Sequence, residues 1–159
     1  MSEHIIPIFY ALDERFLKYG IVSLYSMREN AKRPGATYRI HFLHTDVTPE
    51  SQAKVKTLER YGFEIVFENV SGYLASIATR FPLRDYYSKT TYFRLFIADM
   101  HPEYDKAIYI DSDTIIQGDV AELYDTNLSA FMLGACHEQA MVQVADRRSR
   151  PPKPWYPPG

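Results

Sequence analysis

Short apolar runs alternate with helix-like segments along most of this chain, and this alternation is the feature that most restricts its fold. Four runs rich in aromatic and β-branched residues are predicted to be strands: Ile5–Tyr10, Tyr38–His44, Phe63–Phe67 and Lys106–Ile110. Helical patterns separate the first three runs, over about Arg15–Asn30 and from Thr48 to near Gly62. This order predicts an α/β fold, with a mostly parallel sheet flanked by helices on both faces.

The remaining segments are less regular, and each has a provisional assignment. We expect a short helix within Ser71–Ser88, a helix over Thr90–Met100, a short strand continuation at Thr114–Gln117, a helical turn at Asp119–Tyr124 and a strand at Phe131–Cys136. Thr48 is expected to cap the second helix, with Pro49 at its first position. The first 145 residues are expected to form one domain, and residues 146–159 a proline-rich tail that is extended or disordered.

Composition excludes several classes of function. The chain has 159 residues and a formal net charge of −2, so it has no basic surface that would indicate nucleic-acid binding. Its one cysteine, Cys136, allows no intrachain disulfide and is expected to be a small buried residue. Neither a signal peptide nor a membrane-spanning stretch is recognisable, and we therefore expect a cytoplasmic protein.

Asp111 and Asp113 carry the strongest chemical signal, because they follow a buried strand directly. Side chains two positions apart on a strand point to the same side, so both carboxylates can reach one cation. Hard oxygen ligands of this kind suit Mg²⁺ or Mn²⁺, and such an ion can stabilise a departing diphosphate. The alternative is that both acids are solvated loop residues, one of which caps a helix.

Several motifs together resemble glycosyltransferase family 8, whose members have the GT-A fold. The motifs are Ala11-Leu12-Asp13 after the first strand, Thr90-Thr91-Tyr92-Phe93-Arg94-Leu95, Tyr109-Ile110-Asp111-Ser112-Asp113, and the following Thr114–Val120 and Leu123–Asp125. They occur in consistent order over roughly residues 5 to 137, which makes the resemblance more specific than the acid pair alone. The resemblance implies a Rossmann-like sheet, here truncated after the Asp-x-Asp region relative to the family.

The resemblance also implies residue roles. Asp111 and Asp113 would bind Mn²⁺ (or Mg²⁺), and through it the diphosphate of a UDP-sugar. Ala11 and Asp13 would contact the uracil and help to seat the nucleoside. Arg94 would reach the diphosphate or the sugar, and Ser112 would contribute backbone near the ribose. Two alternatives stay open, namely that Asp13 only caps a helix and that Arg94 is only a surface ion-pair residue.

The chain also departs from the family pattern. Arg15 stands where the family often has Asn, and the segments that form the acceptor site are not found. Lys153-Pro154-Trp155 matches a family signature, but it occurs early and has no histidine shortly before it. The third protein ligand of the metal and the catalytic residues therefore remain unassigned.

The function that we expect is metal-dependent hexosyl transfer from UDP-glucose or UDP-galactose, with retention of configuration. The acceptor would be a saccharide, a glycolipid or a protein. One alternative is a nucleotide-sugar-binding fragment without turnover, in which exposed apolar surface would favour homo-oligomers. Another is a Mg²⁺-dependent phosphatase with an aspartyl nucleophile.

Overall fold

A computed structural model describes residues 4–77, 90–129 and 131–135 of the chain. The chain divides into two compact units, residues 1–126 and 127–159. The first unit contains all the helices and strands of the described residues: β1 (His4–Ala11), α1 (Leu17–Asn30), β2 (Ala36–His44), α2 (Pro49–Lys56), β3 (Phe63–Asn69), α3 (Ser71–Ile77), α4 (Thr90–Phe93), the 3₁₀ turn η1 (Arg94–Phe96), α5 (Ile97–Met100), β4 (Ile108–Tyr109) and α6 (Val120–Tyr124). No helix among the described residues is long and apolar enough to span a membrane.

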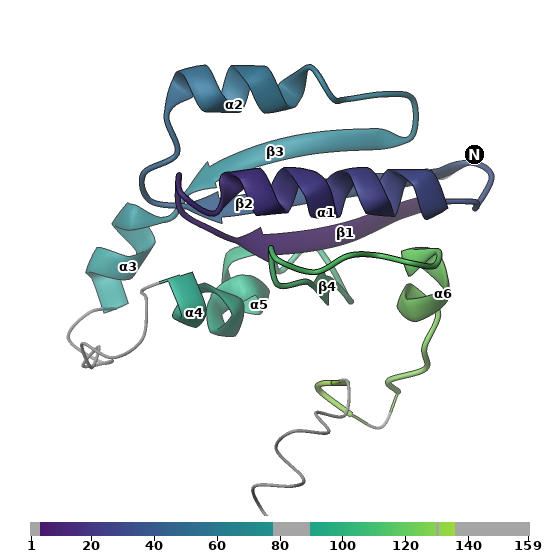
Figure 1. Cartoon of the computed structure of the whole chain (residues 1–159). Helices are drawn as coiled ribbons and strands as arrows, with labels where there is room; N and C mark the ends of the chain where they lie inside the picture. The colour runs from purple at the N-terminus through teal and green to yellow at the C-terminus, as the bar shows by residue number, and fades with distance from the viewer. Residues whose placement is uncertain (1–3, 78–89, 130, 136–159) are drawn as a thin grey trace, which may run out of the picture. The chain divides into compact units, whose positions relative to one another are not determined.

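Four parallel strands form the sheet in the order β3-β2-β1-β4, which confirms the expected α/β architecture (Figure 1). The chain adds β2 and β3 on one side of β1 and then returns to place β4 on the other side. The strand order thus reverses between β1 and β4, which makes this point of the sheet a topological switch point. Sheets of this type bind ligands beyond the carboxyl ends of the strands at such a point, which here are the ends of β1 and β4.

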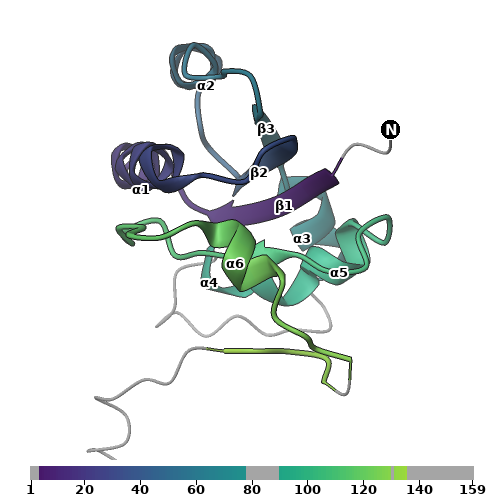
Figure 2. The same cartoon turned by 90° about the vertical axis from the view of Figure 1, so that its right-hand side faces the viewer.

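Helices cover both faces of this sheet (Figure 2). Ile6, Ile8 and Tyr10 of β1 pack with α1 and α2 in the larger core cluster, whereas Phe9 and Ala11 pack with α3, α4 and α5 in a second cluster. Successive residues of β1 thus alternate between two buried faces, as the side-chain period of two requires. Burial on both sides explains why β1 reads as a nearly continuous apolar run.

The helix ends follow local chemistry. Thr48 caps α2, since its hydroxyl accepts a hydrogen bond from the Ser51 amide at 3.2 Å. The helix ends at Lys56 and not near Gly62 as expected, and the Thr57 hydroxyl donates back to the Lys54 carbonyl at 2.7 Å. Gly62 has a φ of 80° and forms the turn before β3 instead. The first helix begins at Leu17, two residues later than expected.

The expected helix over Thr90–Met100 is interrupted, because α4 and α5 are separated by η1. Phe93 and Phe96 are both buried, whereas Leu95 is 64% exposed. Two buried rings three positions apart match the period of a 3₁₀ turn better than that of an α-helix. Burial of these rings therefore explains why η1 interrupts the helix. Arg94 is the first residue of η1.

Two expected strands are wrong, and β4 is shorter than expected. Residues 114–117 form no strand, because a turn closed by a 3.1 Å bond from Thr114 N to Asp111 O leads the chain away from the sheet. Residues 131–135 of the second unit form no strand either, and Phe131, Met132 and Leu133 are exposed. An apolar run is no strand without a partner for its backbone, and the bond from Phe131 N to Leu128 O makes a turn there. Cys136 and the tail at 146–159 lie outside the described residues.

Candidate donor site at the carboxyl ends of β1 and β4

The Asp111–Asp113 segment lies at the switch point, directly after β4. Phe9 of β1 pairs with Tyr109 of β4, and Ile110 N donates to Phe9 O at 3.0 Å. Two residues further along each strand are Ala11 and Asp111. The structure therefore brings the ends of the two expected motifs next to each other.

The two acids do not lie on a strand, which corrects the geometry that the sequence predicted. Regular pairing of β4 ends at Tyr109, and the Asp111–Thr114 turn follows. Ser112 is buried, whereas Asp111 and Asp113 are exposed. Exposed, buried and exposed side chains therefore alternate over Asp111, Ser112 and Asp113, as they would on a strand. Here a turn produces this alternation.

One oxygen of Asp111 is the meeting point of two other side chains. Arg94 donates from Nη2 to Asp111 Oδ1 at 2.9 Å, and the hydroxyl of Tyr109 donates to the same oxygen at 2.9 Å. The Arg94 guanidinium also lies over the Tyr109 ring, with Cζ 4.4 Å from the ring centroid. The ion pair that was the alternative reading of Arg94 is therefore formed with a residue of the candidate site.

Tyr109 is a residue of this site to which the sequence analysis gave no role. Burial raises the pKa of its hydroxyl well above the ordinary value of 10, and the negative charge of Asp111 acts in the same direction. The hydroxyl therefore stays protonated at neutral pH and serves as a donor. Its position two residues before Asp111 was the available signal, since both side chains leave the backbone on the same side.

The end of β1 forms the other side of the candidate site. Ala11 is 8% exposed at the last position of the strand. Asp13 receives a hydrogen bond from Phe16 N to Oδ1 at 2.8 Å, so it does stabilise the turn into α1. Leu12, between them, is buried against α1 and is held by a bond from its amide to Leu43 O at 3.1 Å.

The close approach of α1 to this region depends on Gly20. A Cβ atom at Gly20 would lie 2.7 Å from Leu12 Cδ2 and 3.9 Å from Ser112 Cβ. The absence of a side chain at Gly20 therefore allows α1 to approach Leu12 this closely, whereas the distance to Ser112 is an ordinary contact. Ser112 is buried, and its expected backbone role near the ribose stays a prediction.

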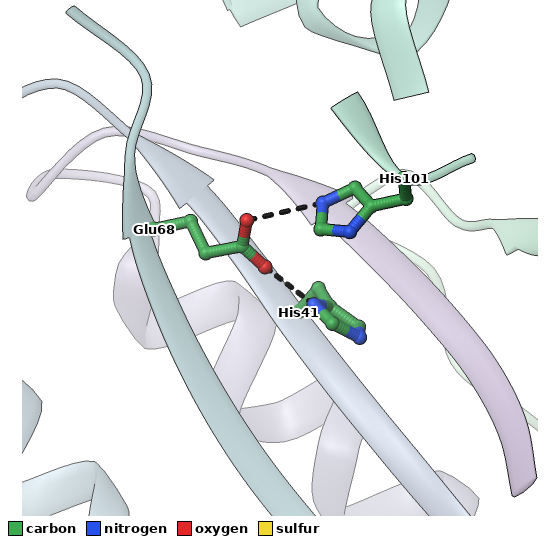
Figure 3. Close-up of side chains that lie close together, drawn as sticks. All are labelled: His41, Glu68 and His101. Atoms are coloured by element: carbon green, nitrogen blue, oxygen red, sulfur yellow. Dashed lines mark hydrogen bonds and ion pairs between the residues drawn. The ribbon is translucent and has the colours of Figure 1, made fainter. Parts of the chain in front are cut away.

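Asp111 and Asp113 lack a third protein ligand within the part of the chain that the structure describes. Among the His, Cys, Asp and Glu side chains of those described residues, the one group of three that could hold a metal ion is His41, Glu68 and His101. That group lies on the β2–β3 side of the sheet, and sequence reasoning missed it (Figure 3). Burial raises the pKa of Glu68, but contacts from His41 and His101 outweigh this effect and hold it below its ordinary value.

Comparison with known proteins now identifies the family. The family model described as Glycosyl transferase family 8 matches residues 7–156. The chain belongs to glycosyltransferase family 8. The match extends beyond residue 137 and includes Lys153-Pro154-Trp155, which lie outside the described residues. This family assignment argues against the alternative of a Mg²⁺-dependent phosphatase with an aspartyl nucleophile.

Relatives and solved structures agree with this family assignment. The chain is 28% identical over 133 residues to a Danio rerio protein named glycosyltransferase 8 domain-containing protein 1. The matched region covers 84% of this chain and 36% of the relative. It is similar to the apo structure of the bifunctional glycosyltransferase WbbM, with a TM-score of 0.67 and 25% identity, over 80% of this chain and 22% of that one. The galactosyltransferase LgtC, in complex with donor and acceptor sugar analogues, gives a TM-score of 0.60 and 26% identity over 77% of this chain and 43% of that one. This family 8 chain thus spans less than half the length of each of these proteins.

Proposed function

We propose that the chain is the donor-binding part of a hexosyltransferase, which binds a UDP-sugar together with a divalent cation at Asp111 and Asp113. The observation that carries the proposal is the convergence of Arg94 and Tyr109 on Asp111 Oδ1 at the switch point of the sheet. Switch points of parallel sheets are where nucleotides bind in folds of this type. The donor-binding part would comprise residues 1–145.

The residues present fit a hard cation. Two exposed carboxylates with one residue between them offer oxygen ligands only, which suits Mn²⁺ or Mg²⁺. Arg94 and Tyr109 both contact Oδ1 of Asp111, so the cation would be ligated through Oδ2. Two carboxylates cannot complete a six-ligand shell, and the oxygens of a diphosphate suit the remaining positions. When bound, the ion would supply charge stabilisation for the leaving diphosphate.

The chain's own groups would position the donor around this point. Tyr109 remains a neutral donor and holds the Asp111 carboxylate in one orientation. Arg94 is paired with Asp111, and its planar fork is suited to bind phosphate oxygens when a donor is present. Ala11 and Asp13 would contact the uracil, and Ser112 would face the ribose with its backbone.

The donor sugar is either glucose or galactose in this proposal, and transfer would retain the configuration of the sugar. Likeness to LgtC, whose structure is that of a galactosyltransferase with donor and acceptor analogues, makes UDP-galactose the first donor to test. A saccharide, a glycolipid or a protein would be the acceptor.

Titration calorimetry with UDP tests the proposal. Wild-type protein should bind UDP in Mn²⁺ and lose most of the affinity in EDTA. Asp113→Asn should weaken Mn²⁺-dependent binding by at least about 10-fold, since it removes a charged ligand. Asp105→Asn is the matched control, because Asp105 is an exposed acid that precedes the same strand at its other end.

The control should bind UDP as the wild type does. Equal UDP affinity in Asp113→Asn and Asp105→Asn, or no binding by folded wild-type protein in Mn²⁺, would contradict the proposal. If binding is present, incubation with UDP-galactose and UDP-glucose then shows whether either sugar is hydrolysed or transferred.

A further inference from the structure

His41, Glu68 and His101 form a mostly buried cluster on the face of the sheet that α3, α4 and α5 cover. His41 lies on β2 and Glu68 on the neighbouring β3, whereas His101 directly follows α5. The two oxygens of Glu68 point toward the two rings (Figure 3): Oε1 contacts Nδ1 of His41, and Oε2 lies 3.0 Å from Nε2 of His101. The side chains of His41 and His101 are 5% and 9% exposed, so little water can reach their rings.

The second nitrogen of each ring has a partner outside the group. Nδ1 of His101 lies 3.0 Å from Glu103 Oε1, and Nε2 of His41 lies 3.2 Å from the hydroxyl of Tyr104. A carboxylate only accepts hydrogen bonds, so the contact with Glu103 requires a proton on Nδ1 of His101. In a neutral ring, Nε2 of His101 then presents a lone pair toward the negatively charged Glu68.

This arrangement leaves a buried nitrogen without a hydrogen bond. Nε2 of His101 is within reach of Glu68 Oε2 but lacks hydrogen-bond geometry with it. A lone pair and a carboxylate oxygen that face each other at 3.0 Å repel unless a positive species lies between them. A metal ion would satisfy both groups at once, and the ring of His41 would supply a third ligand atom.

We propose that His41, Glu68 and His101 bind a Zn²⁺-type divalent transition metal, at a site separate from the Asp111–Asp113 pair. The three ligand atoms all lie within 4.8 Å of one another. Tetrahedral zinc with bonds of about 2.0–2.1 Å places its ligand atoms roughly 3.4 Å apart. Shifts on the order of 1 Å therefore bring the three side chains into coordination.

The donor set and its surroundings select the metal. Two imidazoles and one carboxylate are a ligand set typical of zinc, whereas the oxygen-only pair at Asp111 and Asp113 suits Mn²⁺ or Mg²⁺. Glu103 would orient His101 in the way that carboxylates orient zinc-bound histidines in other proteins. Glu68 and Glu103 together carry two negative charges, which match the charge of the ion.

The metal would join three segments that the fold brings together from distant parts of the sequence. It would attach the chain after α5 to β2 and β3, and so hold the α4–η1–α5 segment against the sheet. Phe9 of β1 already stacks on the His41 ring at 4.4 Å and lies 4.8 Å from the His101 ring. We therefore assign the ion a structural role, and its removal should lower the melting temperature.

The test measures Zn²⁺ binding by tag-free protein in the Asp113→Asn background, which removes the competing donor site. This background and its Glu64→Gln derivative should bind one Zn²⁺ per chain, and Co²⁺ in its place should give the intense visible absorption of a tetrahedral ion. Glu68→Gln should weaken Zn²⁺ binding by at least about 10-fold. Glu64 is the matched control, since it lies four residues earlier on β3 and pairs with Arg39 instead.

Glu103→Gln provides a second variant in case Glu68→Gln does not fold. It leaves all three ligands in place, and Zn²⁺ affinity should fall by about 10- to 100-fold because His101 loses its orienting carboxylate. Equal Zn²⁺ affinity in Glu68→Gln and Glu64→Gln would overturn the proposal. Unchanged affinity in Glu103→Gln, or no Zn²⁺ binding by folded protein, would do the same and would leave a proton as the species between Glu68 and His101. None of these outcomes depends on whether the chain binds a UDP-sugar.

Discussion

Alanine at Gly20 and alanine at Gly72 should change stability in opposite directions, although both glycines lie in helices. A Cβ at Gly20 would lie 2.7 Å from Leu12 Cδ2 and 3.3 Å from Phe42 Cε1, and both of these side chains are fully buried. A Cβ at Gly72 in α3 would meet no atom within 4 Å. The two substitutions thus share the same chemistry and differ in the space available.

The size of each effect follows from these contacts. Replacing glycine by alanine in a helix contributes about 0.4–1 kcal/mol of stability when there is room for the methyl group. Overpacking a closed core costs about 1–3 kcal/mol. We therefore expect Gly72→Ala to be stabilised by a few tenths to about 1 kcal/mol, and Gly20→Ala to be destabilised by about 1 kcal/mol.

Urea denaturation followed by circular dichroism gives both free energies of unfolding, and UDP titration in Mn²⁺ gives the consequence for the site. Movement of Leu12 in Gly20→Ala would displace the turn that carries Ala11 and Asp13, so donor affinity should fall in this variant and stay unchanged in Gly72→Ala. A Gly20→Ala protein as stable as Gly72→Ala would refute the reasoning, because it would mean that α1 does not approach Leu12 closely.

Two further predictions concern single hydrogen bonds. Tyr109→Phe removes the hydroxyl that donates to Asp111, and it should weaken Mn²⁺-dependent UDP binding by roughly 3- to 10-fold. Tyr124→Phe is the control, because the Tyr124 hydroxyl donates to the backbone before β4, and this variant should bind UDP as the wild type does. Burial raises the pKa of Asp119, but its hydrogen bonds, first that from Ala121 N, outweigh burial and hold the pKa below 3.8. Stability from this carboxylate is therefore present above about pH 4 and lost as the pH falls through the folded-state pKa. Asp119→Ala should cost about 1 kcal/mol at pH 7, and a urea series in which this difference does not shrink toward pH 3 would contradict the assignment.

Most of the first three strands could be predicted because their side chains face a core on both sides. Ile5–Tyr10 has apolar residues throughout and Tyr38–His44 has them at four of seven positions, and the structure extends these strands by only one or two residues at their ends. The cap at Thr48 was equally predictable, since a cap needs only residues next to it in the sequence. Elements that depend on distant contacts were predicted less well.

The predicted strand at Phe131–Cys136, of which residues 131–135 are described, and the predicted continuous helix over Thr90–Met100 illustrate those failures. An apolar run predicts burial, but it does not say whether a partner strand is present, and Met132 is fully exposed. The interruption at η1 depends on where Phe93 and Phe96 find space in the core, which no local pattern contains. Propensity was overridden by packing in that case.

The sequence by itself determined the parallel α/β architecture, the family and the pair of acids after a buried strand, because each of these is recognised from local motifs and from their order along the chain. Only the tertiary structure decided that Arg94 and Tyr109 share one oxygen of Asp111 and that His41, Glu68 and His101 meet. Side-chain alternation assigns a residue to one face of a strand. Its neighbours on that face depend on the register between strands and on the path of the returning chain, and both are fixed by the packing of the whole sheet.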